Sequence, residues 1–503
     1  MANNGLIFVT NAAKAHSLVS KVNKFVKNML YIKINNDSAN LLPILNKQIV
    51  NIYSNLSSQN TDIRLMLKPG SSADKVQTNH PINVIFYDSE LNKQVDELKQ
   101  TVKNLDMVHK VVSVDSQDAE ETLAEEKVKT YEYVAVGGTF DRLHNGHKIL
   151  LSEAALRATK HVTVGVTDVN MIQSKVLWEL IEPVEKRIQG VLDFLTDINP
   201  DLEYKVEPIQ DLYGPTKSDP RYELIVVSEE TMRGAVKINL KREQNGLNPL
   251  DAYVIALATD TSSQRSQEEE SKVSSSNQRM RILGTVLREP EPNPNIPESP
   301  YVIGLAGGIA SGKSNIAEKL KLKGAAIVNC DIIAHELYKP GLPLNRTLAE
   351  VFGDRIITDD GEVDRRKLGQ IVFSDKEQLE KLNRTVWPAV IEEAQRRIRA
   401  LGEAGYKVVV MEAAVMVRAK WYKYCHQLWS VIIPPAEAIK RLQQRNSLSE
   451  LEARQRIESQ PSNLEQVAAA NVVFSPYWSY DYTQAQVDKA WDHLQQYIAG
   501  TTE

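Results

Sequence analysis

Short apolar runs alternate with amphipathic stretches through the middle of the chain. The runs YVAVGG, HVTVGVTD and YELIVVS, at 133–138, 161–168 and 222–228, predict buried strands because they are almost continuous in apolar residues. Between them, HKILLSEAALRATK (147–160) and PVEKRIQGVLDFLTDI (183–198) repeat apolar residues at helical spacing. Such alternation predicts a parallel sheet that binds ligands at the carboxyl ends of its strands.

The C-terminal part repeats this pattern. Its predicted strands are YVIGLAG (301–307), AAIVNCD (325–331), KVVVMEA (407–413) and LWSVIIP (428–434). Near the N-terminus, PINVIFYD (81–88) and HKVVSVDS (109–116) also have the pattern of strands. The fold class is therefore α/β, with two parallel-sheet domains preceded by an N-terminal region of unknown role that is itself a candidate α/β domain.

Two breaks in the pattern predict the domain boundaries. Five prolines fall between 288 and 300, where they remove backbone donors and favour an extended chain. The stretch 116–130 is rich in acidic residues. We therefore expect an N-terminal region (1–128), a second domain (131–288), a proline-rich linker (289–300) and a last domain (301–503). A polar tract at 259–279 has the composition of a disordered loop, a reading we retain for its first half only.

Composition narrows the class of protein. The 503 residues are 42% hydrophobic and 25% charged, which is ordinary for a globular chain, and the net charge of -5 offers no basic field for nucleic acid. Two cysteines are too few for a disulfide scaffold or a cysteine-rich zinc module. No window contains the roughly 20 apolar residues of a membrane-spanning helix. We expect a soluble, intracellular protein.

The first residues resemble a weak targeting segment. No acidic residue precedes Asp37, five lysines do, and Val19, Val22, Val26 and Met29 would share one face of a helix. This pattern is compatible with a mitochondrial or membrane-surface signal, although arginine is absent. We expect a cytoplasmic protein, with the mitochondrion or its surface as the alternative location.

The stretch GGIASGKS matches the phosphate-loop pattern G-x-x-x-x-G-K-[ST]. It follows a predicted strand and opens a helix, so its backbone N–H groups and the helix N-terminus would face a phosphate. Lys313 would reach the β and γ phosphates of ATP, and the Ser314 hydroxyl would hold Mg²⁺. The predicted nucleotide-binding residues are Gly307, Gly308, Ile309, Ala310, Ser311, Gly312, Lys313 and Ser314.

Asp331 ends the next predicted strand, at the sheet edge that carries the phosphate loop. A carboxylate there would orient and deprotonate an acceptor hydroxyl, or else act only as the N-cap of the following helix. Farther on, the arginine-rich stretch 439–457 has helical periodicity. It is either a segment that closes over the nucleotide, as in small-molecule kinases, or a solvated helix face.

The C-terminal pattern resembles the dephospho-coenzyme A kinase family across 302–494. The resemblance includes CDIIAHELY (330–338), DRRKLGQIVF (364–373) and LNRTVWP (382–388). It implies that Asp331 is the base for a ribose 3′-hydroxyl and that Arg445 is a lid residue near the ATP phosphates. Four residues depart from the family pattern, namely Trp387, Glu412, Arg418 and Asn471. The resemblance therefore assigns no substrate contacts to that part of the site.

Two histidines, His144 and His147, lie three residues apart in GGTFDRLHNGHK (137–148). They could belong to a zinc site, which would need a third ligand, or be a structural pair at a helix N-terminus. The flanking residues favour a phosphate site. Gly137, Gly138 and Gly146 leave room for an anion at the helix N-terminus, Thr139 adds a hydroxyl, and the two imidazoles would stabilise an α-phosphate during displacement.

This stretch resembles the H-x-G-H signature of the nucleotidyltransferase superfamily. Its second signature, [IV]-S-S-[ST]-x-x-[RK], is matched by VSSSNQR (273–279), with Ser274, Ser275, Ser276 and Arg279 expected on the triphosphate. Segments at 164–187, 211–220 and 226–235 resemble the eukaryotic type of phosphopantetheine adenylyltransferase. That resemblance implies substrate or nucleotide phosphate contacts for Lys175 and Arg187.

The order of the two domains, a Rossmann-like nucleotidyltransferase and then a P-loop kinase, resembles the bifunctional coenzyme A synthase family. It implies the last two steps of coenzyme A biosynthesis: adenylyl transfer from ATP to 4′-phosphopantetheine, giving dephospho-coenzyme A and pyrophosphate, and then phosphorylation of the ribose 3′-hydroxyl. The cofactors implied are ATP at both sites and Mg²⁺. The alternative is an active adenylyltransferase whose kinase half is only a nucleotide-binding regulatory module.

Overall fold

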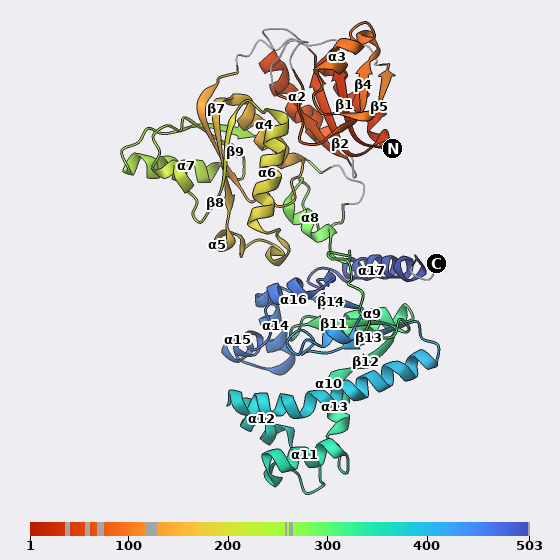
Figure 1. Ribbon diagram of the computed structural model, residues 1–503. Helices are drawn as coiled ribbons and strands as arrows, with labels where there is room; N and C mark the ends of the chain where they lie inside the picture. Colours follow the sequence, from red (N-terminus) through yellow and green to blue (C-terminus); the bar gives the residue numbers. More distant parts are fainter. Residues whose placement is uncertain are drawn as a thin grey trace. The chain divides into compact units, whose positions relative to one another are not determined.

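The computed structural model describes residues 1–35, 41–55, 61–67, 75–115, 128–256, 259–260, 265–373 and 375–500. The chain divides into two compact units, Met1–Gln278 and Arg279–Glu503. Together they contain three parallel sheets, two in the first unit and one in the second (Figure 1). Among the described residues, no helix is both long and apolar enough to cross a bilayer.

The two sheets of the first unit share one topology. The N-terminal sheet has the strand order β3-β2-β1-β4-β5, and the second sheet has the equivalent order β8-β7-β6-β9-β10. In each sheet the first strand is central and the strand order reverses beside it, which creates a switch point at the carboxyl ends of the strands. The strands are β1 (Ala2–Val9), β2 (Val26–Ile34), β3 (Asp62–Leu65), β4 (Ile82–Asp88), β5 (Leu105–Val114), β6 (Tyr131–Gly138), β7 (Ala158–Thr167), β8 (Glu203–Ile209), β9 (Leu224–Ser228) and β10 (Asp251–Ile255).

The α-helices of the first unit connect these strands, and the last of them crosses into the second unit. They are α1 (Ala15–Val22), α2 (Leu41–Asn55), α3 (Val95–Thr101), α4 (Asn145–Arg157), α5 (Val169–Ile172), α6 (Val184–Ile198), α7 (Met232–Gln244) and α8 (Ser275–Arg281). The predicted helix 147–160 is shorter than expected, because the chain enters β7 at Ala158.

The N-terminal segment does not form the single helical face that its sequence predicts. Val19 and Val22 lie on α1, whereas Val26 and Met29 lie on β2, so the prediction of one shared face is wrong. Val19, Val22 and Val26 are each at most 3% exposed and pack in the core of the first unit. The apolar character of these valines is therefore explained by their burial in a core of strands and helices.

The N-terminal region and the second sheet share one hydrophobic core. A single cluster of buried side chains includes Ile49 and Tyr53 of α2 together with Leu151 of α4 and Phe194 of α6. The rings of Tyr53 and Phe194 lie 6.4 Å apart between centroids. The two parts that the sequence separates at 116–130 are therefore one packed unit.

The second unit is built on a sheet of order β12-β13-β11-β14-β15, all parallel. Its strands are β11 (Tyr301–Gly307), β12 (Ala326–Asn329), β13 (Val408–Glu412), β14 (Gln427–Val431) and β15 (Val472–Phe474). Its helices are α9 (Lys313–Leu322), α10 (Cys330–Leu337), α11 (Pro343–Phe352), α12 (Arg365–Phe373), α13 (Lys376–Glu403), α14 (Pro435–Asn446), α15 (Glu450–Glu458), α16 (Asn463–Ala469) and α17 (Tyr480–Gly500).

The boundary between the units falls earlier than the proline-rich stretch predicts. The backbone N–H of Gly284 donates to Val473 at 2.9 Å, and that of Leu287 donates to Asn471 at 2.7 Å. The proline-rich stretch also contacts the second unit, where the Asn293 amide donates to the Lys423 carbonyl at 2.7 Å. Residues 279–288, which we assigned to the preceding domain, pack with the second unit because their backbone pairs with β15 and its neighbours.

Candidate active sites

The phosphate loop joins the end of β11 to the start of α9 and lines a cleft of about 680 Å³. All eight predicted loop residues, 307–314, line this cleft. The rest of its wall is formed by Asn315, Asp331, Ala414, Arg441, Gln444, Arg445 and Gln460. The structure therefore brings the predicted loop, Asp331 and Arg445 together.

Two glycines of the loop have no room for a side chain. A Cβ at Gly307 would lie 2.9 Å from the Val431 carbonyl oxygen and 2.7 Å from the Ser311 hydroxyl. Gly312 has a φ of +91° and a Cβ there would lie 2.8 Å from Pro476. Local sterics therefore demand glycine at both positions, and the sharp turn leaves the loop N–H groups at the amino end of α9.

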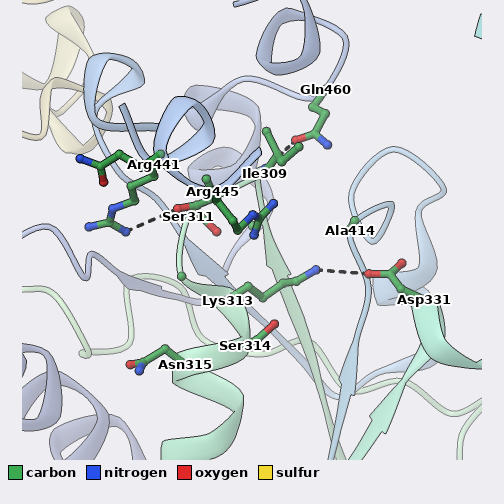
Figure 2. Close-up of a pocket in the computed structure, with 15 residues that line it drawn as sticks. Ile309, Ser311, Lys313, Ser314, Asn315, Asp331, Ala414, Arg441, Arg445 and Gln460 are labelled. Carbon is green, nitrogen blue, oxygen red and sulfur yellow. Dashed lines mark hydrogen bonds and ion pairs between the residues drawn. The ribbon is translucent and has the colours of Figure 1, made fainter. Parts of the chain in front are cut away.

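Lys313 and Asp331 point toward each other in the cleft (Figure 2), and Lys313 also lies near Glu412 at the end of β13. The Lys313 ammonium lies 3.8 Å from an Asp331 carboxylate oxygen and 3.9 Å from Glu412. The Ser314 hydroxyl donates to the same Glu412 oxygen at 2.9 Å, and the Asn329 amide donates to the other oxygen at 2.9 Å. A buried carboxylate thus orients the two side chains that would meet the phosphates and Mg²⁺.

Asp331 is the second residue of α10 and its side chain is 49% exposed. The N-cap of that helix is Asn329, whose side chain accepts from the Ile332 N–H at 3.0 Å. The alternative in which Asp331 is only a helix cap is therefore wrong. Its carboxylate is available to a ligand in the cleft.

Three contributors to this site are given no individual role in the sequence analysis: Glu412, which is noted only as a departure from the family pattern, Arg441, which lies in the arginine-rich stretch 439–457, and Gln460. Arg441 donates to the Ala310 carbonyl at 3.4 Å and to the Pro476 carbonyl at 2.8 Å, and Gln460 accepts from the Ile309 N–H at 2.7 Å. Glu412 had a sequence indication, because it ends an apolar run. Gln460 had none, because its contact spans 151 residues.

The other departures from the family pattern lie outside the phosphate cleft. The Asn471 side chain accepts from the Leu428 N–H at 2.8 Å and donates to the Arg288 carbonyl at 3.0 Å, so it holds the sheet edge. Trp387 packs edge-on against Trp421, 6.2 Å between ring centroids. Arg418 is exposed and does not line the cleft.

The histidine pair stands at the start of α4. His144 is the N-cap and its ring stacks on that of His147, with centroids 3.8 Å apart. The Nδ1 atom of His147 is buried and makes no hydrogen bond within the described residues. Burial of the ring, with His144 and Lys175 nearby, holds the pKa of His147 well below its usual range. The imidazole is therefore neutral at pH 7 and keeps one N–H donor.

Gly146 makes this stacking possible. A Cβ there would lie 3.2 Å from both Cε1 and Nδ1 of His144. A Cβ at Gly138 would meet the ring of Phe140 at 3.0 Å, whereas one at Gly137 would meet only the Gly165 carbonyl, at 3.9 Å. The packing requirement is thus strong at Gly146 and weak at Gly137.

The second half of the polar tract folds onto the histidine motif. The Ser275 hydroxyl donates to the Asp141 carbonyl at 3.0 Å and lies 3.4 Å from Nε2 of His144. The Ser274 hydroxyl accepts from the Asn277 N–H at 3.2 Å at the start of α8. This part of the tract is therefore structured, as predicted, while part of its first half, residues 261–264, lies outside the described residues. Ser276 and Arg279 also lie on α8, and Arg279 falls just past the division between the units.

Thr139, Lys175 and Arg187 have different surroundings. The Thr139 hydroxyl accepts a hydrogen bond from the Thr167 hydroxyl at 3.1 Å. The positive charge of Lys175 contributes to lowering the pKa of His147. The buried Arg187 guanidinium donates to the carbonyls of Thr139 and Thr167 at 2.8 and 2.9 Å. Arg187 thus fixes the ends of β6 and β7, and the phosphate contact expected of it stays a prediction.

Among the described residues, no third metal-ligating side chain joins His144 and His147.

Comparison with known proteins finds a similarity for each half of the chain. A Dephospho-CoA kinase family model matches residues 301–476 and a Cytidylyltransferase-like model matches residues 135–281. The dephospho-CoA kinase of Carboxydothermus hydrogenoformans is 38% identical over 37% of this chain and 90% of its own length. That of Moorella thermoacetica is 36% identical over 40% of this chain and 96% of its own. The chain belongs to the dephospho-CoA kinase family.

The kinase domain follows a cytidylyltransferase-like domain on the same chain. This order is that of a bifunctional coenzyme A synthase, as the sequence predicts. The protein is therefore a transferase with a kinase half, and its nucleotidyltransferase half carries the histidine pair.

Proposed function

We propose that this protein carries out the last two steps of coenzyme A biosynthesis. The first site transfers the adenylyl group of ATP to 4′-phosphopantetheine, which gives dephospho-coenzyme A and pyrophosphate. The second site transfers the γ-phosphoryl group of another ATP to the ribose 3′-hydroxyl of that product. The observation that carries the proposal is the pairing of Ser275 with His144, which unites two distant motifs at one helix N-terminus.

At the first site, the acceptor is a phosphate ester that is already ionised at pH 7, so it attacks without a general base. The site must instead orient the two phosphates and stabilise the charge that develops on the α-phosphate. Imidazole donors at His144 and His147, the hydroxyls of Thr139 and Ser275, and the amino end of α4 supply such stabilisation. Ser274, Ser276, Arg279 and Lys175 would hold the remaining phosphates.

At the second site, Asp331 accepts the proton of the ribose 3′-hydroxyl as that oxygen attacks the γ-phosphate. Lys313 stabilises the transferred phosphoryl group, and Arg441 and Arg445 approach from the helical wall of the cleft. Mg²⁺ that enters with ATP suits the Ser314 hydroxyl and the Glu412 carboxylate, which are 2.9 Å apart and offer the oxygen ligands that this ion prefers. The ion would neutralise charge on the β and γ phosphates.

A direct test measures two products of the purified wild-type chain. Pyrophosphate release with 4′-phosphopantetheine and ATP tests the first site, and ADP release with dephospho-coenzyme A and ATP tests the second. Adenosine and shikimate, offered in parallel, test the acceptor specificity of the kinase. Absence of ADP release would favour the alternative of a nucleotide-binding regulatory module, and absence of pyrophosphate release would refute the first step.

A further inference from the structure

The N-terminal region packs against the two helices that flank the histidine site. Helix α2 packs on α4, and strand β3 packs on α6. Helix α4 begins with the histidine motif, and α6 carries Arg187, whose guanidinium holds the carbonyl of Thr139. The N-terminal region therefore contacts the supports of the site.

Two residues of the histidine motif are bonded directly to the N-terminal region. Asn145, which stands between the two histidines, donates its side-chain amide to the Tyr53 carbonyl at 2.7 Å. Lys148, which follows His147, pairs with the Asp62 carboxylate and donates to the Ile63 carbonyl at 3.3 Å. Lys148 is 6% exposed, so the Asp62 carboxylate compensates for the solvent that its ammonium group has lost.

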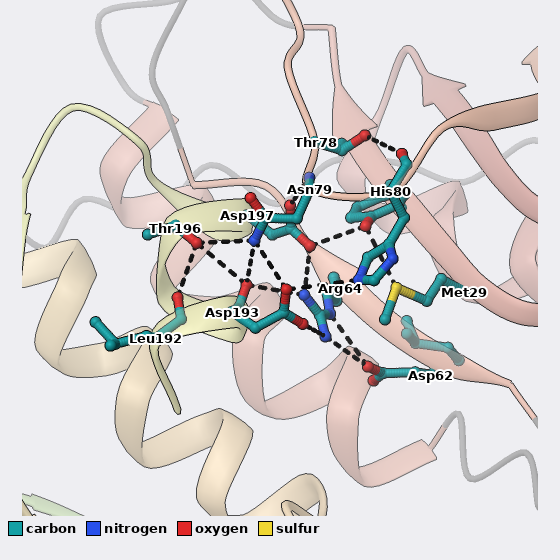
Figure 3. Close-up of polar contacts among 12 residues, drawn as sticks. Met29, Asp62, Arg64, Thr78, Asn79, His80, Leu192, Asp193, Thr196 and Asp197 are labelled. Carbon is teal, nitrogen blue, oxygen red and sulfur yellow. Dashed lines mark hydrogen bonds and ion pairs between the residues drawn. The ribbon is translucent and has the colours of Figure 1, made fainter. Parts of the chain in front are cut away.

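Asp62 links the two helices through a charge network, and Figure 3 shows its side toward α6, with Arg64, Asp193 and Asp197. Besides Lys148, it accepts from Arg64 at 3.0 Å, and Arg64 donates to Asp193 of α6 at 2.7 Å and also pairs with Asp197. Burial raises the pKa of Asp62, but the facing charges of Lys148 and Arg64 outweigh it and hold that pKa below its usual value. The carboxylate is thus ionised at neutral pH and holds α4 and α6 to one strand.

The same groups do not form a cation site. His80, Asp193 and Asp197 lie within ligating distance of one another, but the Arg64 guanidinium occupies both carboxylates. A cation there would have to displace a buried positive charge. The cluster is therefore an ion-pair network that connects the N-terminal region to α6.

The N-terminal sheet has the strand order of a ligand-binding sheet, and its own side chains pair with one another at the switch point. Lys14, which follows β1, pairs with Glu90 at 2.7 Å, and the Thr10 hydroxyl donates to Asp88 at the end of β4 at 3.0 Å. The contacts of this region with the supports of the histidine site are made instead where it packs on α4 and α6.

We propose that the N-terminal region is a positioning element for adenylyl transfer, in which Asp62 and the Tyr53 carbonyl fix the first turn of α4 through Lys148 and Asn145. The inference rests on the function proposed for the histidine site. Donors to a transition state must be held to within about 0.5 Å, and the two histidines lie on the first residues of a helix, where backbone hydrogen bonds alone leave the end free to fray. Lys148 and Asn145 are positioning residues in this scheme.

The test substitutes Lys148 and Asn145 in the full chain. Lys148→Met keeps the length of the side chain and removes its charge, and Asn145→Ala removes one hydrogen bond and leaves the charge network in place. We expect the kcat of pyrophosphate release to fall about 30-fold for Lys148→Met and about tenfold for Asn145→Ala, with KM for ATP changed less than about threefold. Lys148→Arg should recover most of the rate.

The matched control is Lys160→Met, an exposed lysine of the same unit whose nearest carboxylate, Glu132, lies 3.9 Å away. It should leave pyrophosphate release unchanged, and ADP release from dephospho-coenzyme A should be unchanged in every variant. If the wild type releases no pyrophosphate, the proposed function itself fails. If the wild type is active and folded Asn145→Ala and Lys148→Met keep its kcat, the positioning role is refuted; if Lys148→Met does not fold, Asn145→Ala decides.

Discussion

Substitution of Gly146 by alanine should impair adenylyl transfer without unfolding the protein. The added Cβ would lie 3.2 Å from Cε1 and Nδ1 of His144, against ordinary contacts of 3.4–4 Å. The imidazole must therefore move by about 0.3 Å, and since a misplacement of about 1 Å costs about 100-fold in rate, we expect a loss of about fivefold, or about 1 kcal/mol. Complete loss of the donor would set the upper limit, about 100- to 1000-fold.

The assay is pyrophosphate release, with urea unfolding of the first unit measured in parallel. Gly190→Ala is the matched control, because its Cβ would meet only Leu143, at an ordinary 3.7 Å, inside α6. That variant should keep full activity and gain about 0.5–1 kcal/mol of stability. On a His144→Ala background, Gly146→Ala should cost nothing further. Wild-type activity in Gly146→Ala, or an equal loss on the His144→Ala background, would refute the reasoning.

Three further predictions concern the kinase site, the fold and pH. Glu412→Gln should lower the kcat of ADP release about 100-fold and raise the Mg²⁺ concentration needed, because it removes the charge that orients Ser314; an unchanged Mg²⁺ titration would contradict this. Gly284→Ala should destabilise the second unit by more than about 2 kcal/mol in urea, since its Cβ would overlap a backbone carbonyl at a φ of +75°; Gly405→Ala, at a φ of +95° with open space around it, isolates the backbone strain and should cost less. The lowered pKa of His147 predicts that its contribution to stability is complete above pH 6.5 and is lost as the pH falls below that value, so His147→Gln should flatten the dependence of unfolding free energy on pH between 7.5 and 5.

The sequence predicts the parts of this protein that depend on local spacing. Strand and helix alternation predicts β6, β7, β9 and the phosphate-loop strand within a few residues, and both phosphate motifs are recognisable because glycine is forced at fixed positions. Gly312 shows the reason, because its φ of +91° is a turn conformation that favours glycine, whereas Gly307 is confined also by Val431 of the neighbouring strand.

Residues whose role depends on distant contacts were not predicted. Lys148 reads in the sequence as an ordinary polar residue of a helix, and its burial against Asp62 follows only from the packing of the N-terminal region. The proline-rich segment is a similar case. The prolines suggest a free linker but belong to a segment that contacts the second unit. The compact units divide between Gln278 and Arg279, whereas the two family matches, 135–281 and 301–476, fall within the predicted domains.

Product analysis of three proteins tests the central claim most directly. The wild type, His147→Ala and Lys313→Ala would each be incubated with 4′-phosphopantetheine and ATP, and the products separated chromatographically. Two independent sites in series predict coenzyme A from the wild type, no dephospho-coenzyme A from His147→Ala, and accumulated dephospho-coenzyme A from Lys313→Ala. Coenzyme A from either variant at the wild-type rate would contradict the assignment, as would a folded His147→Ala that fails to convert added dephospho-coenzyme A.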